Sequence, residues 1–334
     1  MSKLGLRYRV ETHRLSAPFR ISGYVFETSD VVVVELSDGE FTGRGEAAGV
    51  YYVGDDSAHI IEELETYGEA IANCTDREEL RRLMPRGGAR NAVDCALWDL
   101  EAKREDIDAL RLAKIDEARP LVTTFTLGAD DPQVMAEGAK RYADAQAIKV
   151  KLTGELRLDV ERVAAIRAAR PDVWLGVDAN QGFTRRDLDP LVDALSTHRV
   201  SLLEQPLKRG DEADLDGYRC PIPIAADESA LGLEDVPGLV GRFDVINIKL
   251  DKCGGLTEAL LIAEEARRLG LGVMVGNMVG TSLAMAPAFV VGQHCDVVDL
   301  DGPTFLSEDR KPSCEYRDGT IWCSGEVWGS RLAA

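Results

Sequence analysis

Five ionisable residues recur at regular intervals along the chain, and each stands at the end of a short apolar run. Lys151, Asp178, Glu204, Asp227 and Lys249 follow one another at spacings of 22 to 27 residues. One such aspartate or lysine is usually a turn, capping or solvated residue. That explanation does not predict five in succession with this order of types. Because an unpaired charge is costly to bury, we interpret the five as one group whose charges serve one another or a bound ion.

The residue types in this group indicate proton transfer beside a metal ion. Asp178, Glu204 and Asp227 offer oxygen donors with no histidine or cysteine among them, a set that suits Mg²⁺ better than Zn²⁺. Lys151 precedes the carboxylates and Lys249 follows them, so we expect the two lysines on opposite flanks of the metal. Such lysines can remove a proton from one face of a carbon and return it to the other, while the metal stabilises the enediolate between the two steps. Burial and nearby cations are expected to lower the lysine pKa values towards the range of a general base.

The apolar runs that carry these residues predict buried parallel strands, because they are rich in Val, Ile and Leu without alternation. They cover residues 121–127, 147–152, 173–178, 201–205, 222–227, 244–250, 272–276 and 296–300. The segments between them, such as 158–169 and 256–269, have helical periodicity. Strand–helix units in this number predict a closed β/α barrel, in which the carboxyl ends of the strands meet at one face. A doubly wound sheet is the alternative, but no GxGxxG motif follows the first run.

The first third of the chain predicts a mixed α+β region. Residues 31–36 (VVVVEL) form a short β-branched run that ends at Ser-Asp-Gly, and residues 41–46 predict its hairpin partner. Helical periodicity covers residues 57–84 and 90–103. The character of the sequence changes after Pro120, which predicts a domain boundary there.

The composition disfavours several classes of partner and location. Asp and Glu outnumber Lys and Arg 58 to 39, and a net charge of −19 argues against nucleic acid and anionic membranes as partners. No apolar run approaches the length of a membrane-spanning helix. The first fifteen residues contain no apolar core of a secretion signal, so we expect a cytoplasmic protein.

Neither cysteine nor histidine is expected to carry the chemistry. The cysteines are odd in number, scattered and without a CxxC pair, which argues against a disulfide framework or a thiolate metal site and predicts reduced thiols. They are Cys74, Cys95, Cys220, Cys253, Cys295, Cys314 and Cys323. The four histidines stand outside the strand ends and form no HExxH motif. They are His13, His59, His198 and His294.

These segments resemble the enolase superfamily, specifically its muconate lactonizing enzyme subgroup, over nearly the whole chain. The similar segments are KVK at 149–151, DANQ at 178–181, EQP at 204–206, DES at 227–229 and IKL at 248–250 followed by Gly254-Gly255. The resemblance implies Lys151 and Lys249 as catalytic bases, with Lys149 as an electrostatic neighbour. It implies Asp178, Glu204 and Asp227 as the ligands of one Mg²⁺ per subunit.

The same resemblance implies an α/β architecture, a modified TIM barrel of the (β/α)₇β type with an α+β capping domain. The barrel is expected at residues 119–302 and the cap at residues 1–118, to which a C-terminal segment, residues 303–334, returns. Members of this family are often dimers or octamers, so a homo-oligomer is implied.

Asp299-Leu300-Asp301 ends the eighth run and resembles the DxD motif of dipeptide epimerases, in which paired carboxylates bind the α-ammonium group of the substrate. Two carboxylates at the barrel rim suit a zwitterionic peptide, although a solvated rim or a helix cap before Gly302-Pro303 would also explain them. The resemblance implies an isomerase, a Mg²⁺-dependent dipeptide epimerase that inverts the α-carbon of the C-terminal residue of L-Ala-L-Xaa dipeptides, with L-Ala-D/L-Glu as the default. N-acylamino acid racemisation, o-succinylbenzoate synthesis and non-catalytic binding of a carboxylate or peptide stay open as alternatives.

Substrate side chains in this family meet two cap loops, which the resemblance places at residues 19–27 and 49–56. The first loop contains Arg20, but the basic residue expected further along it is absent, and Asp55 and Asp56 stand in the second loop. An apolar or other second residue therefore stays open beside glutamate. The candidates for substrate binding besides the DxD pair are Lys149, Thr124, Asn180, Asn277, Arg20 and Tyr51.

Overall fold

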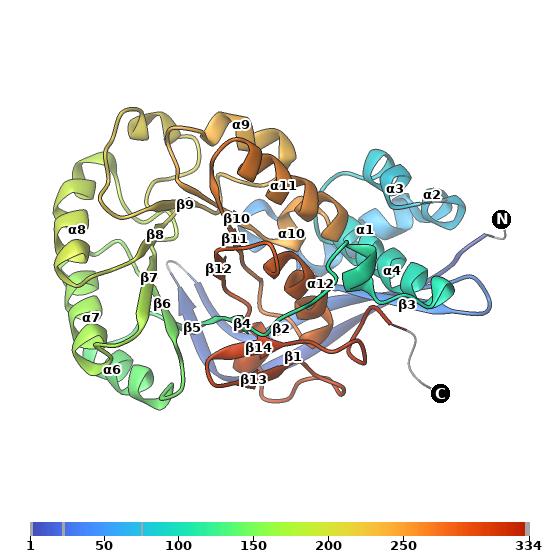
Figure 1. Cartoon of the computed structure of the whole chain (residues 1–334), viewed down its shortest axis with the longest axis horizontal. Coiled ribbons are helices and arrows are strands. Elements are labelled where there is room, and N and C mark those ends of the chain that lie inside the picture. Colours follow the sequence, from blue (N-terminus) through green and yellow to red (C-terminus); the bar gives the residue numbers. More distant parts are fainter. Residues whose placement is uncertain (1–2, 22–23, 75, 331–334) are drawn as a thin grey trace.

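The structure is a computed structural model that describes residues 3–21, 24–74 and 76–330. An eight-stranded parallel sheet curves into a barrel with helices outside it, and a three-stranded antiparallel sheet with its own helices lies beside the barrel (Figure 1). The predicted fold class, a modified TIM barrel with an α+β capping domain, is confirmed.

The barrel strands hydrogen-bond to one another in the order in which they occur along the chain. They are β5 (Thr124–Leu127), β6 (Ala147–Lys151), β7 (Trp174–Asp178), β8 (Leu202–Glu204), β9 (Ile224–Ala226), β10 (Val245–Ile248), β11 (Gly272–Val275) and β12 (Val297–Val298). The paired registers align Lys151 with Asp178 and Asp178 with Glu204. This alignment brings the side chains at neighbouring strand ends to one level of the barrel, at the face where such folds build their sites.

Helices cover the outside of the barrel (Figure 1). The longer ones are α6 (Pro132–Arg141), α7 (Leu156–Ala169), α8 (Arg185–Thr197), α11 (Leu256–Arg268) and α12 (Ser282–Gly292). Asp131 caps α6 by accepting a hydrogen bond from the backbone N–H of Gln133. The shorter connections hold η2 (Glu212–Leu215), η3 (Leu233–Asp235), α9 (Val236–Leu239), α10 (Leu250–Cys253) and η4 (Gly302–Phe305).

Side-chain hydrogen bonds join β12 to β5, the two ends of the strand order. Asp301 Oδ2 accepts from the backbone N–H of Thr126 at 2.6 Å. Thr123 Oγ1 accepts from the backbone N–H of Leu300 at 2.9 Å. The segment 299–301 therefore helps to close the barrel.

The capping sheet consists of β1 (Gly5–Ile21), β2 (Tyr24–Ser37) and β3 (Thr42–Ala47). The helical elements of the cap are η1 (Tyr51–Val53), α1 (Ser57–Thr66), α2 (Gly68–Asn73), α3 (Arg77–Leu83), α4 (Gly88–Glu105) and α5 (Ala109–Leu112). The single helical stretch expected over residues 57–84 is divided into α1, α2 and α3. One reason is that Asp76 forms a new N-cap, accepting from the backbone N–H of Glu79.

The valine run at residues 31–34 is buried on both faces of β2. Val31 and Val33 pack in a core that contains residues of β9 to β12, whereas Val32 and Val34 pack in the core of the cap. Successive side chains of a strand point to opposite faces, so a strand between two cores shows no alternation. On β3, Gly45 allows the close approach of α4, because a Cβ there would lie 2.0 Å from a carbonyl oxygen of that helix.

A hairpin near the C-terminus contradicts one expectation about cysteine. β13 (Glu315–Arg317) pairs with β14 (Thr320–Trp322), and β14 also pairs with β4 (Leu121–Val122). Cys314 and Cys323 flank the hairpin and form a disulfide, so the prediction of reduced thiols is wrong for this pair. The antiparallel register, which places Glu315 opposite Trp322, brings the flanking cysteines together. The free cysteines are Cys74, Cys95, Cys220, Cys253 and Cys295.

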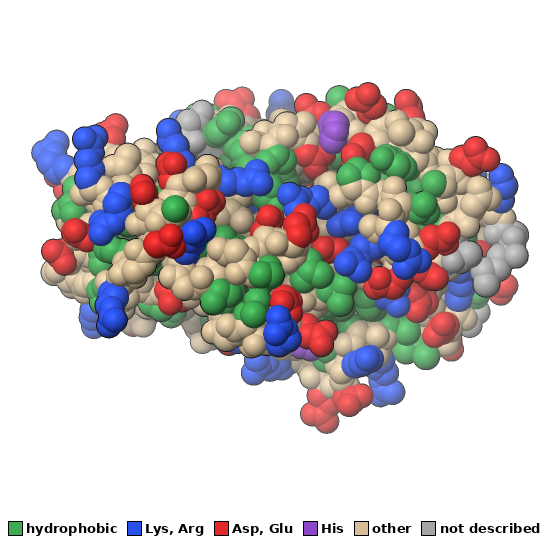
Figure 2. Space-filling view, turned by 90° about the horizontal axis from the view of Figure 1, so that it is seen from above, with side chains coloured by type: hydrophobic (Ala, Val, Ile, Leu, Met, Phe, Trp, Pro, Cys, Tyr) green, Lys and Arg blue, Asp and Glu red, His purple; other side chains and the backbone are tan. Residues whose placement is uncertain are grey.

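The residues after the hairpin lie against the cap. Trp328 Nε1 donates to the carbonyl of Arg44 at 2.9 Å, and the backbone N–H of Gly329 donates to Asp99 Oδ1 at 2.9 Å. Within the described ranges, no helix is both long enough and apolar enough to cross a membrane. Acidic and basic side chains are intermixed on the face seen in Figure 2.

Candidate active site

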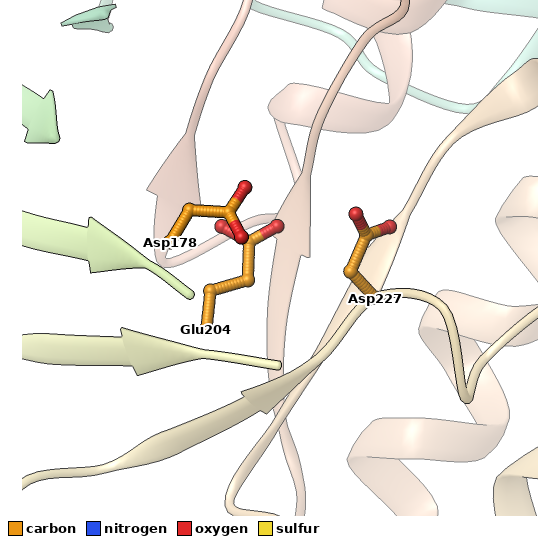
Figure 3. A group of neighbouring side chains, drawn as sticks. All are labelled: Asp178, Glu204 and Asp227. Atoms are coloured by element: carbon orange, nitrogen blue, oxygen red, sulfur yellow. The ribbon is translucent and has the colours of Figure 1, made fainter. Parts of the chain in front are cut away.

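Three carboxylates meet at the carboxyl ends of adjacent barrel strands. Asp178 ends β7, Glu204 ends β8 and Asp227 directly follows β9. Each offers an oxygen within 4.8 Å of the others, and all three side chains are buried. Figure 3 shows the carboxyl groups of Asp178 and Glu204 side by side, with that of Asp227 facing them from the neighbouring strand.

This donor set fits a divalent cation. Three buried carboxylates repel one another in a low dielectric, so the folded state needs positive charge between them. All of the donors are oxygens, as Mg²⁺ prefers. Beside them, Asn180 Oδ1 is buried and has no hydrogen-bond partner among the described residues, so another oxygen is available for an ion, a water molecule or a ligand.

Lysines contact the carboxylates from both sides. Lys151 Nζ on β6 lies 2.6 Å from Asp178 Oδ2, and Lys249 Nζ, after β10, lies 2.8 Å from Asp227 Oδ2. The order of the strands therefore places the triad, which is formed by the carboxylates of Asp178, Glu204 and Asp227, between these two lysines. Lys149 Nζ lies 2.7 Å from Glu204 Oε2 and 3.3 Å from Asp178 Oδ2.

The expectation of lowered lysine pKa values is wrong for Lys249. Burial lowers its pKa, but Asp227 and the other triad carboxylates raise it more, so the pKa lies well above the ordinary lysine value. The same balance of burial against Asp299, Glu204 and Asp178 raises the pKa of Lys149. The charges nearest these lysines are carboxylates rather than cations, and a divalent cation on the triad would offset them.

Two residues that the sequence analysis did not single out complete the arrangement. Asn247 Nδ2 donates to Glu204 Oε1 at 2.7 Å. Lys252 Nζ donates to Asp227 Oδ1 and to the Asp227 carbonyl, both at 2.6 Å, and to the carbonyl of Asn247 at 2.9 Å. Burial raises the pKa of Asp227, but Lys249 and Lys252 lower it more, so it lies well below the usual range.

The predicted DxD pair directly follows β12 and is buried. Asp299 accepts from Thr124 Oγ1 at 2.5 Å and from Lys149 Nζ at 2.8 Å, and its backbone carbonyl accepts from Asn277 Nδ2 at 2.5 Å. Burial and the charge of Asp299 raise the pKa of Asp301 to about 7. Asp299 balances the charge of Lys149 and both carboxylates are enclosed, so the alternative of a solvated rim is wrong.

A cavity of about 380 Å³ lies between the cap and the strand ends. The barrel contributes Lys151, Asn180, Asp227, Lys249, Asn277, Met278 and Val279 to its lining. The cap contributes Leu15, Phe19, Phe26, Thr28, Ser29, Asp30, Ala48, Gly49, Tyr51, Tyr52, Asp55, Asp56 and Ser57. The cavity therefore joins the two lysines and one triad carboxylate to both predicted cap loops.

The predicted cap residues differ in their positions. Tyr51 lines the cavity, as expected for a residue that meets substrate. Arg20 instead lines a neighbouring pocket, with its guanidinium 3.7 Å from Asp130 Oδ2. Its position on β1 directs it away from the triad, which a loop assignment from the sequence does not reveal. Ser22 and Gly23 of the first cap loop lie outside the described residues.

Comparisons with known proteins agree with this architecture. Residues 5–112 match the N-terminal domain of the mandelate racemase / muconate lactonizing enzyme family, and residues 134–325 match the enolase C-terminal domain-like family. An L-Ala-D/L-Glu epimerase of Escherichia coli strain K12 is 38% identical over 93% of this chain and 97% of that protein. An N-acetyl-D-glutamate racemase of a Pseudoalteromonas species is 37% identical over 87% of this chain and 92% of that protein.

Solved structures extend the similarity to three dimensions. An enolase family member from Agrobacterium tumefaciens, with homology to dipeptide epimerases and with bound sodium and L-Ala-L-Glu, has a TM-score of 0.93 at 40% identity, covering 98% of this chain and 100% of that one. A dipeptide epimerase from Enterococcus faecalis V583, complexed with Mg and L-Leu-L-Tyr, has a TM-score of 0.91 at 28% identity over 99% of each chain. The fold, the arrangement of strand ends and both family matches agree, and the chain therefore belongs to the mandelate racemase / muconate lactonizing enzyme family of the enolase superfamily.

Proposed function

We propose that this protein is a Mg²⁺-dependent dipeptide epimerase that inverts the α-carbon of the C-terminal residue of L-Ala-L-Xaa dipeptides. The observation that carries the proposal is the position of Lys151 and Lys249 on opposite sides of the buried carboxylate triad. The names of its relatives, an L-Ala-D/L-Glu epimerase and dipeptide epimerases, support the same reaction class.

The residues of the site have distinct tasks in this reaction. Asp178, Glu204 and Asp227 would hold Mg²⁺, which when bound neutralises the substrate carboxylate and so makes the adjacent α-proton more acidic. Lys151 removes or returns that proton on one face of the α-carbon, and Lys249 does so on the other. Asn180 and Asn277 line the same cavity and offer amide groups that can orient the peptide.

Several further features belong to the proposal and rest on the resemblance to the family. They are one Mg²⁺ per subunit, a homo-oligomeric assembly and domain limits at residues 1–118, 119–302 and 303–334. Lys149, Thr124, Asp299 and Asp301 are proposed to support substrate binding as a linked group. Arg20 is proposed only as a residue of the cap, since its guanidinium lies by Asp130.

A second candidate, racemisation of N-acylamino acids, is favoured by one observation. The carboxylate of Asp299 is buried and already bound to Lys149 and Thr124, so its charge is partly balanced before any substrate ammonium arrives. A substrate without a free ammonium group would not require the carboxylate of Asp299 as a partner. A relative named N-acetyl-D-glutamate racemase supports this candidate.

Proton NMR in D₂O with Mg²⁺ separates these candidates. Loss of the α-proton at the second residue of L-Ala-L-Xaa dipeptides, abolished by a chelator, supports the epimerase. Exchange confined to N-acetylamino or N-succinylamino acids supports the racemase. Tight peptide binding without any exchange would contradict both and indicate a non-catalytic relative.

A further inference from the structure

The cap side of the cavity presents a wall of aromatic side chains. The ring of Tyr51 lies 5.4 Å from that of Phe26 and 5.3 Å from that of Tyr52, measured between centroids. Leu15 and Phe19 extend the apolar lining. Such a wall favours a substrate side chain with an apolar body, because it offers dispersion contacts and removes apolar surface from water.

The charges on the cap side are all negative among the described lining residues. Asp30, Asp55 and Asp56 contribute carboxylates to the lining. The lining cations are Lys151 and Lys249, and each contacts a carboxylate of the triad at the opposite side of the cavity. A negatively charged side chain that extended from the reaction centre to the cap would therefore meet like charge there.

Among the described residues, no lysine or arginine side chain forms an ion pair with these three carboxylates. Asp30 Oδ1 accepts from Thr12 Oγ1 at 2.6 Å, and Asp56 Oδ1 accepts from the backbone N–H groups that start α1. Asp55 accepts from the backbone N–H of Gly88 at 2.8 Å and contacts His59 Nδ1 at 3.1 Å. These carboxylates therefore meet polar donors and one histidine, and the described lining of the cap contains no lysine or arginine that could receive a negatively charged side chain.

The composition of the two sides of the cavity favours one position for the side chain of the reacting residue. In the proposed reaction its carboxylate lies at the triad and its α-carbon lies between Lys151 and Lys249. The barrel side of the cavity is lined by these charged and amide groups and by Met278 and Val279, whereas the aromatic wall and most of the lining residues belong to the cap. We therefore place the side chain of the reacting residue towards the cap.

Resting on the proposed function, we propose that the site selects dipeptides whose second residue has an apolar body and no negative charge. Neutral apolar and basic side chains fit this description. Glutamate, the default substrate suggested by the resemblance, does not. A basic side chain can lay its methylene stem along the aromatic wall and bring its cation to the carboxylates of the cap.

A matched series of four dipeptides tests the proposal by α-proton exchange in D₂O with Mg²⁺. L-Ala-L-Glu and L-Ala-L-Gln differ mainly in charge, whereas L-Ala-L-Met and L-Ala-L-Lys add an apolar and a basic side chain of similar length. We expect kcat/KM for the Gln dipeptide to exceed that for the Glu dipeptide by about tenfold, the effect of one unfavourable charge in a partly solvated site. The Met and Lys dipeptides should match or exceed the Gln dipeptide.

Two variants test whether the carboxylates of the cap cause the preference for Gln over Glu. Asp30→Asn retains an acceptor for Thr12 and removes one charge from the lining, so it should reduce the preference for Gln over Glu by about two- to tenfold. Asp144→Asn removes the same charge from an exposed position before β6, at the other end of the barrel, and should leave the preference unchanged.

The outcomes distinguish this inference from the reaction itself. Exchange that is faster with L-Ala-L-Glu than with L-Ala-L-Gln would overturn the selectivity and leave the epimerase intact. An equal change in selectivity in both variants would also overturn the role of the cap carboxylates. Exchange with none of the four dipeptides would overturn the proposed function and this inference with it.

Discussion

Replacing Lys252 by methionine removes a buried cation from beside the triad. The ammonium group makes three hydrogen bonds, two to Asp227 and one to the carbonyl of Asn247, and the residue is 3% exposed. Methionine has a similar length and no charge, so the variant tests the ammonium group more than the packing of its stem.

The expected loss of stability in Lys252→Met follows from the buried groups that lose their hydrogen-bond partner. Breaking a buried ion pair from one side costs about 3–5 kcal/mol, and each buried acceptor left unpaired costs about 1–3 kcal/mol. These contributions overlap because they belong to one cluster. Asp227 also keeps its contact with Lys249, so we expect Lys252→Met to lose about 3 kcal/mol in the free energy of unfolding when a chelator is present.

Mg²⁺ should restore part of this loss. In the variant, Asp227 faces Asp178 and Glu204 with less positive charge nearby, so a divalent cation held by the three carboxylates stabilises the variant more than the wild type. Urea unfolding with Mg²⁺ and with chelator measures both quantities. We expect the stability difference between wild type and variant to shrink by about 1 kcal/mol or more when Mg²⁺ saturates the site.

Arg167→Met provides a matched control. Arg167 is another buried cation, but it donates to the carbonyls of Val173 and His198, which precede β7 and β8 at the opposite end of the barrel. The Arg167→Met variant should lose the same free energy of unfolding relative to the wild type with and without Mg²⁺. Equal stabilisation of the wild type and both variants by Mg²⁺ would refute the coupling between Lys252 and a metal at the triad.

Three further predictions address the chemistry, the pH dependence and the cap. Lys151→Ala and Lys249→Ala should each abolish epimerisation, while one of them retains α-proton exchange on a single face; normal epimerisation by both, measured by NMR, would contradict the two-base mechanism. Burial raises the pKa of Asp251 to about 7, and this carboxylate accepts two backbone N–H groups of the loop before η1. Because the pKa is raised in the folded state, the stability that the protonated Asp251 contributes is complete below about pH 4 and is lost as the pH rises through about 7. An asparagine side chain cannot titrate, so the free energy of unfolding of Asp251→Asn relative to the wild type should rise by at most about 4 kcal/mol between those pH values. If the free energy of unfolding changes with pH in the same way for the wild type and for Asp251→Asn, Asp251 does not titrate in this way. Gly45→Ala should cost about 1–3 kcal/mol because its Cβ would overlap a carbonyl of α4, whereas Gly5→Ala, whose nearest contact would be 3.6 Å, should change thermal stability little.

The barrel and the grouping of the triad are predictable from the sequence for a physical reason. Strands buried on both faces leave apolar runs, and adjacent parallel strands bring their last residues together. Asn247 is predictable by the same logic, since it stands two residues before Lys249 and so points to the same face. Lys252 leaves a weaker signal, because the direction of the four-residue helix α10 is set by packing rather than by a pattern.

Other features depend on contacts that a sequence does not record. The pairing of Cys314 with Cys323 requires the register of a hairpin. The pKa of Lys249 depends on which charges lie nearest to it in space. The burial of Asp299 depends on Lys149, which reaches it from a different strand. The roles of the site residues and the domain limits remain predictions.

The valine run of β2 makes the two domains inseparable as folding units. Val31 and Val33 contribute to one core and Val32 and Val34 to the other, so melting of either domain would expose two valines and the surface against which they pack. Each buried valine contributes about 1.5–3 kcal/mol, enough for the shared strand to couple the domains into a single unfolding transition. A capping domain taken from another protein would need a strand whose side chains pack against this barrel as those of β2 do. New substrate preferences in this scaffold are therefore reached more readily by substitutions on the cavity wall than by exchange of whole domains.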